Sequence, residues 1–175
     1  MPQDQTEVEL EKRPVKSFTR GGDKGFTQVG LEDDGSTPIL DVKYSPLVQL
    51  WGEIDELSGF LGMTEGRFTG YQKLLSEIMS MLYFNKIDTD KINKQISRME
   101  KFCMKYETNL GKEFMLLSGY VNLSRVWARR VERRLWEVIG NNKNSDLRVL
   151  AKFFNRFSSY LFIHTACANE ITDLE

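Results

Sequence analysis

The stretch RVWARRVERRL, residues 125–135, places five arginines within three turns of a predicted helix. At about 100° per residue, Arg125, Arg129 and Arg133 share one face, and Glu132 lies beside Arg129. Arginine binds phosphate oxygens through two parallel N–H groups and does not lose its charge, so this pattern is typical of an anion site. Because cations this close repel one another, carboxylates of neighbouring helices or a polyphosphate ligand must compensate them.

Two other interpretations of this helix stay open. A solvated charged face with scattered ion pairs is the simpler one. A helix that binds nucleic acid is opposed by the acidic stretch GEIDEL, by an acidic loop and by the net charge of -1. We expect Arg130 and Arg134 on the flank of the arginine face, and we expect the opposite side, with Trp127, Val131, Leu135 and Val138, to face the core.

A second candidate for phosphate chemistry is the glycine-rich stretch FTRGGDKGFTQVG, residues 18–30. It matches neither the P-loop pattern nor the dinucleotide-binding fingerprint. Its glycines nevertheless allow several backbone amides to turn toward one point, while Arg20 and Lys24 add positive charge. Such a nest of amides can cradle phosphates, so we predict an anion-binding loop here.

The last apolar stretch of the chain carries polar residues whose roles differ. Asn155 is either a polar contact for a ligand or a structural hydrogen bond between helices, and Ser159 shares its face. His164, the sole histidine, lies on the apolar face and is predicted to be a packed core residue. Cys103 and Cys167 form no CxxC motif, so we predict two reduced cysteines and no metal site built from His or Cys.

Helices must position these residues. Five helices joined by short loops predict an all-α, antiparallel five-helix bundle of the ferritin-like, up-down type, with an irregular N-terminal loop that binds an anion. The stretch LEDDGSTPILDVKY, residues 31–44, is expected to be an irregular loop, and no segment is confidently predicted as a strand. Apolar spacing predicts helices that begin at Ser45 and Pro46 and that span about 69–84, 88–107, 121–139 and 146–172.

Length and composition predict a single domain. The chain has 175 residues, of which 41% are hydrophobic and 28% charged, as in an ordinary globular protein. We expect a mobile tail over residues 1–16 and one helical domain over residues 17–172. Without a secretory signal or a membrane-spanning apolar run, a cytoplasmic protein that binds neither membrane nor nucleic acid is predicted.

Four blocks of the sequence, taken together, resemble the PduO-type ATP:cob(I)alamin adenosyltransferases. They are FTRGGDKGFT, LWGEIDELSGFLG, SRVWARRVERRL and FFNRFSSYLFIHTACANE, in the order of the family's N-terminal loop and its first, fourth and fifth helices. The resemblance covers residues from about 17 to about 170. It implies a five-helix bundle that assembles as a homotrimer with ATP at the subunit interfaces.

The activity implied by this resemblance is transfer of the 5'-deoxyadenosyl group of ATP to the cobalt of cob(I)alamin, which yields adenosylcobalamin and triphosphate. Mg²⁺ is expected to accompany the triphosphate, and an adenosylcobalamin-dependent enzyme or a corrinoid reductase is a further partner. By matching position, Arg125, Arg129 and Phe114 have catalytic roles, Phe114 as an apolar wall near the corrinoid. The implied ATP-binding residues are Thr19, Arg20, Gly22, Asp23, Lys24, Gly25, Thr27, Lys43, Arg129, Glu132, Arg133 and Asn155.

The chain departs from the family pattern at Ser45, Ser58 and Ser159 and in a shortened segment over residues 114–124. The family aspartate in place of Ser45 pairs with the arginine that matches Arg125. These departures motivate an alternative, a divergent non-catalytic paralogue that binds ATP or a corrinoid as a sensor, carrier or partner subunit. A plain helical interaction scaffold is a weaker alternative.

Overall fold

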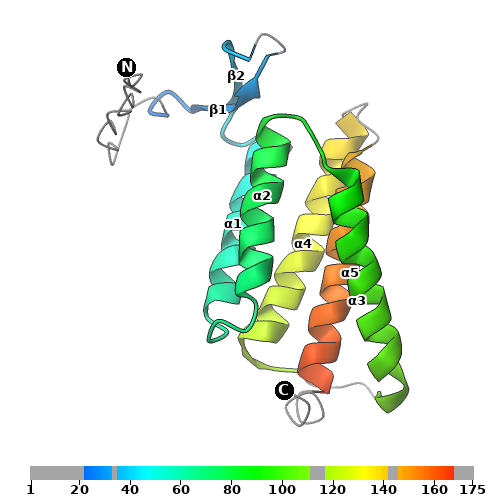
Figure 1. Cartoon of the computed structure of the whole chain (residues 1–175). Helices are drawn as coiled ribbons and strands as arrows, with labels where there is room; N and C mark the ends of the chain where they lie inside the picture. The colour runs from blue at the N-terminus through cyan, green and yellow to red at the C-terminus, as the bar shows by residue number, and fades with distance from the viewer. Residues whose placement is uncertain (1–21, 33–34, 111–116, 142–145, 168–175) are drawn as a thin grey trace, which may run out of the picture.

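The structure is a computed structural model that describes residues 22–32, 35–110, 117–141 and 146–167, so the expected tail over residues 1–16 lies outside the described residues. Five helices run alternately up and down, which confirms the predicted bundle (Figure 1). A short 3-10 turn, Glu107–Asn109, extends the third helix. The helices are α1 (Pro46–Gly62), α2 (Thr69–Tyr83), α3 (Thr89–Tyr106), α4 (Gly119–Asn141) and α5 (Leu147–Ala166).

Local sequence signals define where two of these helices begin. The side chain of Ser45 accepts a hydrogen bond from the backbone N–H of Val48 at 3.3 Å, and Pro46 follows in the first turn of α1. At α3, Oδ1 of Asp88 accepts a hydrogen bond from the N–H of Lys91 at 2.9 Å. The predicted starts of both helices are therefore confirmed.

The core fills the space between the five helices, and α5 supplies its largest side chains. Phe153, Phe154 and Phe157 of α5 are fully buried. The predicted stripe of α1 is also confirmed, because Leu50, Ile54, Leu57 and Leu61 are fully buried, while Leu47 and Trp51 pack against the core from its edge. On α4, Val131, Leu135 and Val138 face the core as expected, and Trp127 is only half-buried.

His164 lies in an aromatic cluster between α2, α3 and α5, and its prediction as a core residue is confirmed. Its ring stacks on Phe102 with centroids 4.6 Å apart and meets Phe68 and Tyr160 edge to face. The residue is 9% exposed, and its Nε2 atom is buried without a hydrogen-bond partner among the described residues. Burial is the main cause that lowers the pKa of His164 to about 4, and the nearby positive charge of Arg67 adds to it.

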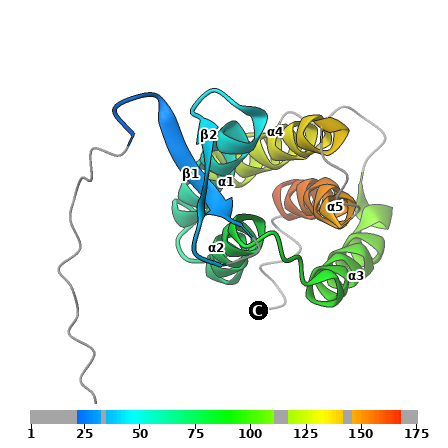
Figure 2. The same cartoon turned by 90° about the horizontal axis from the view of Figure 1, so that it is seen from above.

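The N-terminal part of the described chain forms a β-hairpin, which corrects two expectations. Strands β1 (Phe26–Leu31) and β2 (Pro38–Val42) pair antiparallel, so the stretch predicted as an irregular loop contains a strand, and β1 lies within the glycine-rich stretch. The hairpin lies across the ends of α1 and α2 (Figure 2).

Tertiary contact explains why the hairpin could not be recognised from local pattern. Val29 and Gly30 of β1 are buried against the bundle, and the side-chain amide of Gln28 donates a hydrogen bond to the Tyr83 hydroxyl of α2. A Cβ atom on Gly30 would lie 2.8 Å from the Tyr83 carbonyl oxygen, so glycine allows this close approach. No helix among the described residues is both long enough and apolar enough to cross a membrane.

Candidate anion-binding site

Two arginines of the predicted stripe line a cavity between α4, α5 and the end of α3. The cavity has a volume of about 400 Å³, and Ser158 and Ser159 of α5 are among the residues that line it. Arg125 and Arg129 of α4 line the same cavity. The remaining lining residues are Cys103, Glu107, Leu110, Phe162 and Ile163, so the cavity combines cationic, hydroxyl and apolar surface with one carboxylate.

The arginine stripe has little internal compensation. Arg125 donates a hydrogen bond from Nε to the side-chain oxygen of Asn122 at 2.8 Å. Within the described part of the chain, no carboxylate lies within ion-pair distance of Arg125, Arg129 or Arg133. These guanidinium groups are thus not neutralised by a described carboxylate, and their binding of an anionic ligand stays a prediction.

The thiol in this cavity stays protonated. Burial raises the pKa of Cys103, and the nearby carboxylate of Glu107 raises it further. Both cysteines are free and at least half-buried, which confirms the prediction of two reduced cysteines. A neutral thiol gives the cavity wall a weakly polar surface rather than a nucleophile.

Glu132 of α4, the helix that carries the stripe, contacts Asn155 of the neighbouring α5. Nδ2 of Asn155 donates a hydrogen bond to Oε1 of Glu132 at 3.0 Å. The amide oxygen accepts a hydrogen bond from Nη1 of Arg156 at 2.5 Å, and Nε of Arg156 donates to Glu100 at 2.7 Å. The interpretation of Asn155 as an interhelical hydrogen bond is therefore confirmed, and its contact with a ligand stays a prediction.

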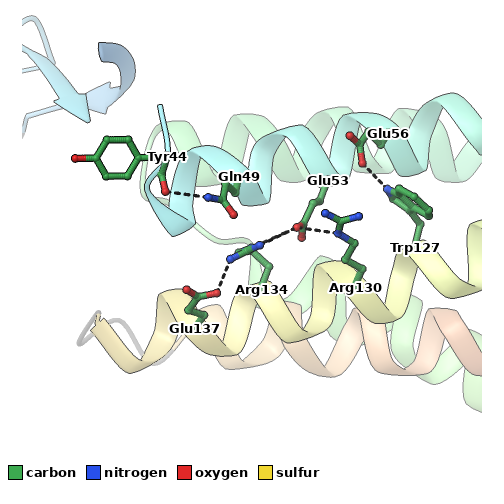
Figure 3. A network of polar contacts seen from close by, with 8 residues as sticks. All are labelled: Tyr44, Gln49, Glu53, Glu56, Trp127, Arg130, Arg134 and Glu137. Atoms are coloured by element: carbon green, nitrogen blue, oxygen red, sulfur yellow. Dashed lines mark hydrogen bonds and ion pairs between the residues drawn. The ribbon is translucent and has the colours of Figure 1, made fainter. Parts of the chain in front are cut away.

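The other two arginines of α4 turn toward α1, where Glu53 binds both of them (Figure 3). Oε1 of Glu53 accepts hydrogen bonds from Nε of Arg130 at 3.1 Å and from Nη2 of Arg134 at 3.1 Å. Arg134 also donates to Glu137 at 2.5 Å. The expectation that carboxylates of a neighbouring helix compensate part of the arginine cluster is met by Glu53.

Sequence reasoning missed Glu53, although a signal was present. It lies three residues after Leu50 and four before Leu57, both of which are fully buried. An acid inside such an apolar stripe must be buried with a cation, and the adjacent helix that is richest in arginine is α4. Pairing of the two patterns would have indicated that Glu53 binds an arginine of that helix, but not which arginine.

Trp127 joins α4 to α1 on the same side as Glu53. Its Nε1 donates a hydrogen bond to the carboxylate of Glu56 at 2.6 Å, and its ring meets Phe60 edge to face (Figure 3). The guanidinium of Arg130 lies over the Trp127 ring, 5.3 Å from the centroid. The seam between α1 and α4 is therefore fixed by several directional contacts.

The described half of the glycine-rich loop is a tight turn before β1. The N–H of Gly25 donates to the carbonyl of Gly22 at 3.2 Å, and Gly25 has a φ of 82°, which favours glycine. The N–H of Lys43 donates to the Gly25 carbonyl at 2.9 Å, and a Cβ on Gly22 would lie 2.8 Å from Lys43 Nζ. The hairpin thus brings Lys43 to the turn.

Several predicted site residues are placed separately from the arginine cavity. Asp23 and Lys24 are exposed at the turn, and Thr27 lies on β1 opposite Asp41 of β2. Thr19, Arg20 and Phe114 lie outside the described residues. No described contact joins this turn to the arginines of α4.

Within one protomer, the glycine turn and the arginine cavity lie toward opposite ends of the helical bundle. The hairpin lies where α1 begins and α4 ends, whereas Arg125 and Arg129 lie in the first half of α4 (Figure 1). At 1.5 Å per residue, Arg125 is about 24 Å of helix away from the end of α4. Within one protomer, the described turn therefore lies far from Arg125.

A larger cavity of about 820 Å³ lies between the hairpin and the bundle. Most of its lining is apolar, and Glu32 is the charged residue among those that line it. A carboxylate, that of Glu107, also lines the smaller cavity, but two arginines line it as well, whereas no cation lines the larger one. The smaller cavity is therefore the better anion site despite its size.

The structure locates the three serines at which the chain departs from the family pattern. Ser45 caps α1, and the carbonyl of Ser58 accepts a hydrogen bond from Gln72 at 2.9 Å. Ser159 lines the arginine cavity beside Ser158. Of the three, Ser159 is therefore the one that lines the cavity that Arg125 and Arg129 also line.

Curated proteins and solved structures similar to this chain were found across most of its length. A corrinoid adenosyltransferase of Mycobacterium leprae is 27% identical, with 91% of this chain and 94% of the relative covered. The corrinoid adenosyltransferase of Bacillus subtilis is 26% identical, with 89% and 87% covered.

Two solved structures share the fold. A variant PduO-type adenosyltransferase from Lactobacillus reuteri complexed with ATP has a TM-score of 0.65 at 22% identity, covering 89% of this chain and 95% of that one. A second variant, complexed with cobalamin and ATP, has a TM-score of 0.60 at 23% identity, covering 90% and 93%. The family model described as cobalamin adenosyltransferase matches residues 17–168. With that match over most of its length, the chain belongs to the cobalamin adenosyltransferase family.

Proposed function

We propose that this protein transfers the 5'-deoxyadenosyl group of ATP to the cobalt of cob(I)alamin and releases triphosphate. The observation that carries the proposal is the cavity in which Arg125 and Arg129 have no carboxylate partner among the described residues. The match of residues 17–168 to the cobalamin adenosyltransferase family supports it. The relatives named corrinoid adenosyltransferase support the same reaction class.

The chemistry explains why arginines are needed. An electron pair of Co(I) attacks C5' of ATP, a cobalt–carbon bond forms, and the C5'–oxygen bond breaks. Its electron pair leaves with the triphosphate, which gains negative charge as it departs. Preorganised cations stabilise this charge in the transition state, and Arg125, Arg129 and Arg133 are assigned that task. Glu132 and Asn155 hold the helix face that carries them.

Magnesium and the apolar wall complete the proposal. In the described ranges no cluster of three His, Cys, Asp or Glu residues could hold a metal ion, so Mg²⁺ is assigned to the triphosphate oxygens. There it would neutralise part of the leaving-group charge. Phe114, outside the described residues, is assigned to the apolar wall on the corrinoid side.

The separation within one chain supports a site shared by two copies. The turn with Gly22, Lys24 and Gly25 lies at the opposite end of the bundle from Arg125 and Arg129. We assign the phosphate wrap of one protomer to the arginine cavity of its neighbour, in a homotrimer. The exposed Trp136 and Val126, on the same outer side of α4 as Arg129, are suited to burial in that contact.

The direct test combines the protein, ATP and chemically reduced cob(I)alamin without oxygen and follows the light-sensitive adenosyl product. Product formed well above the uncatalysed background is expected. ATP binding with no product would contradict the transfer reaction and would favour the non-catalytic paralogue.

The shared site has its own test by complementation. Lys24→Ala and Arg129→Ala variants are each expected to be impaired, and co-assembly of the two is expected to regain activity, because some interfaces then pair an intact turn with an intact cavity. Mixed assemblies no more active than their parents would contradict the shared site.

A further inference from the structure

Glu53 is a charged residue inside the bundle. Its side chain is 6% exposed and lies on α1 between fully buried apolar residues. One oxygen, Oε1, accepts every hydrogen bond that the described residues make to it, from Nε of Arg130 and from Nε and Nη2 of Arg134 (Figure 3). The carboxylate therefore binds two arginines of α4 through a single atom.

The other oxygen shows that this arrangement is a poor stabiliser. Oε2 of Glu53 is buried and has no hydrogen-bond partner among the described residues. The loss of water around a buried carboxylate offsets its attraction to a cation, and an unmatched acceptor adds to that loss. An apolar residue of similar volume is expected to serve packing at least as well. Stability therefore does not account for a carboxylate at this position.

The carboxylate is explained by another property: it divides the five arginines of α4 into two groups. Glu53 holds Arg130 and Arg134 toward α1, while Arg125, Arg129 and Arg133 face away from that seam. Arg130 and Arg133 are three positions apart, so their directions differ by about 60° around the helix. The Arg130 side chain is 48% exposed, and without its hydrogen bond to Glu53 it could turn toward an anion at the stripe.

We propose that Glu53 is a positioning residue for the triphosphate. It holds Arg130 and Arg134 away from the anion and leaves the other three arginines of α4 free to bind it. This inference rests on the proposed function. Additional arginines that reach the bound anion would strengthen binding of ATP before the reaction. They would not be positioned to stabilise the triphosphate as it departs. Such binding does not raise the rate of the chemical step, so loss of Glu53 is expected to lower kcat more than affinity.

The test uses Glu53→Met, which preserves volume, and Glu53→Gln, which preserves shape, in the full chain. Both variants are expected to lower kcat at least about tenfold while KM for ATP changes less than about threefold or falls. The thermal midpoint is expected to stay within about 5 °C of the wild type, because the freed arginines can regain water. Glu137→Gln, which removes the second partner of Arg134, and the distant Glu77→Gln are controls with the same change of charge, and neither is expected to alter kcat.

A double variant separates positioning from general damage. Adding Arg130→Gln to Glu53→Met removes an arginine that the first change sets free, and kcat is expected to recover in part. Unchanged kcat in both single variants would overturn the proposal. So would a large loss of thermal stability in both, because the carboxylate would then be structural.

A binding measurement is independent of catalysis and keeps this inference distinct from the proposed function. Calorimetry with inorganic tripolyphosphate is expected to show affinity that falls more steeply with salt in Glu53→Met than in the wild type, because more cations then reach the anion. If the wild type forms no adenosyl product, the proposed function is wrong. The salt dependence of tripolyphosphate affinity still tests whether Glu53 controls the number of arginines that reach the anion. Equal salt dependence in wild type and variant would overturn the inference.

Discussion

Asn155 of α5 donates a hydrogen bond to Glu132 of α4, with 3.0 Å between Nδ2 and Oε1. The orientation of this amide is determined by its neighbours. Arg156 can only donate, so the amide oxygen must face it, and the amide nitrogen must face Glu132. An amide nitrogen carries two hydrogens, so one stays available for a ligand. Asn155 can therefore hold α4 and contact a nucleotide at the same time.

Asn155→Asp tests this connection. A carboxylate in place of the amide would repel Glu132 and lose the donated hydrogen bond, so the free energy of unfolding should fall by about 1–3 kcal/mol. ATP affinity should fall with it, because Glu132 and the arginine face lose their support. Urea unfolding and calorimetry measure the two effects. Asn93→Asp, on the exposed side of α3, is the control, and an equal effect there would contradict the role of Asn155.

Arg129→Ala tests the cavity itself. Loss of a charge-assisted hydrogen bond to phosphate costs about 1.5–3 kcal/mol, so ATP should bind about 10- to 100-fold more weakly. Arg129→Lys should fall between wild type and alanine, since lysine keeps the charge but not the two-pronged geometry. Calorimetry supplies the dissociation constants. The exposed Arg148→Ala should bind ATP like the wild type, and a similar loss there would indicate a general effect of charge.

The low pKa of His164 predicts that the folded protein is less stable in acid. Its pKa in the folded protein is about 4, below the usual value of 6.5, so the unfolded chain binds the proton more tightly. The free energy of unfolding should therefore decrease as the pH falls from about 6.5 to about 4, by about 1–3 kcal/mol in all, and this contribution is complete above that window. Urea unfolding at pH 4.5 and pH 7.5 measures it. In His164→Phe this part of the pH dependence should vanish, and an unchanged profile would show that other groups cause it.

Gly30→Ala tests the contact between the hairpin and α2. The added Cβ would lie 2.8 Å from the Tyr83 carbonyl oxygen, so the strand must shift and the hairpin should detach more readily. Faster hydrogen exchange at the amides of β1 would report this change. Gly59→Ala on α1 meets nothing within 4 Å in the chain and should instead stabilise the helix by about 0.5–1 kcal/mol. Equal exchange in Gly30→Ala and wild type would contradict the contact.

Ser159→Asp tests the departure inside the cavity. A carboxylate at this position would line the same cavity as Arg125 and Arg129 and compete with an anionic ligand, so tripolyphosphate affinity should fall. Ser158 is buried beside it and serves poorly as a control, whereas Ser80→Asp on the exposed side of α2 adds the same charge elsewhere. Calorimetry measures both variants. Affinity that is unchanged in Ser159→Asp would place the bound anion away from this wall.

The sequence by itself determined the five helices and the arginine stripe. Apolar residues at spacings of three and four leave one buried face per helix, and caps such as Ser45 and Asp88 mark the starts. The same periodicity assigned Arg125, Arg129 and Arg133 to one face before any partner was known. Local rules suffice here because a helix makes its own backbone hydrogen bonds.

Only the tertiary structure decided which contacts these elements make with one another. The strands of the hairpin depend on contact with α2, so their short sequences carry little signal of their own. Which carboxylate binds which arginine was likewise undetermined, because Glu53 and Arg134 are 81 positions apart in sequence. The placement of the glycine turn far from the cavity of the same chain follows from the direction of α4. Each of these depends on contacts between distant segments, which only the folded chain creates.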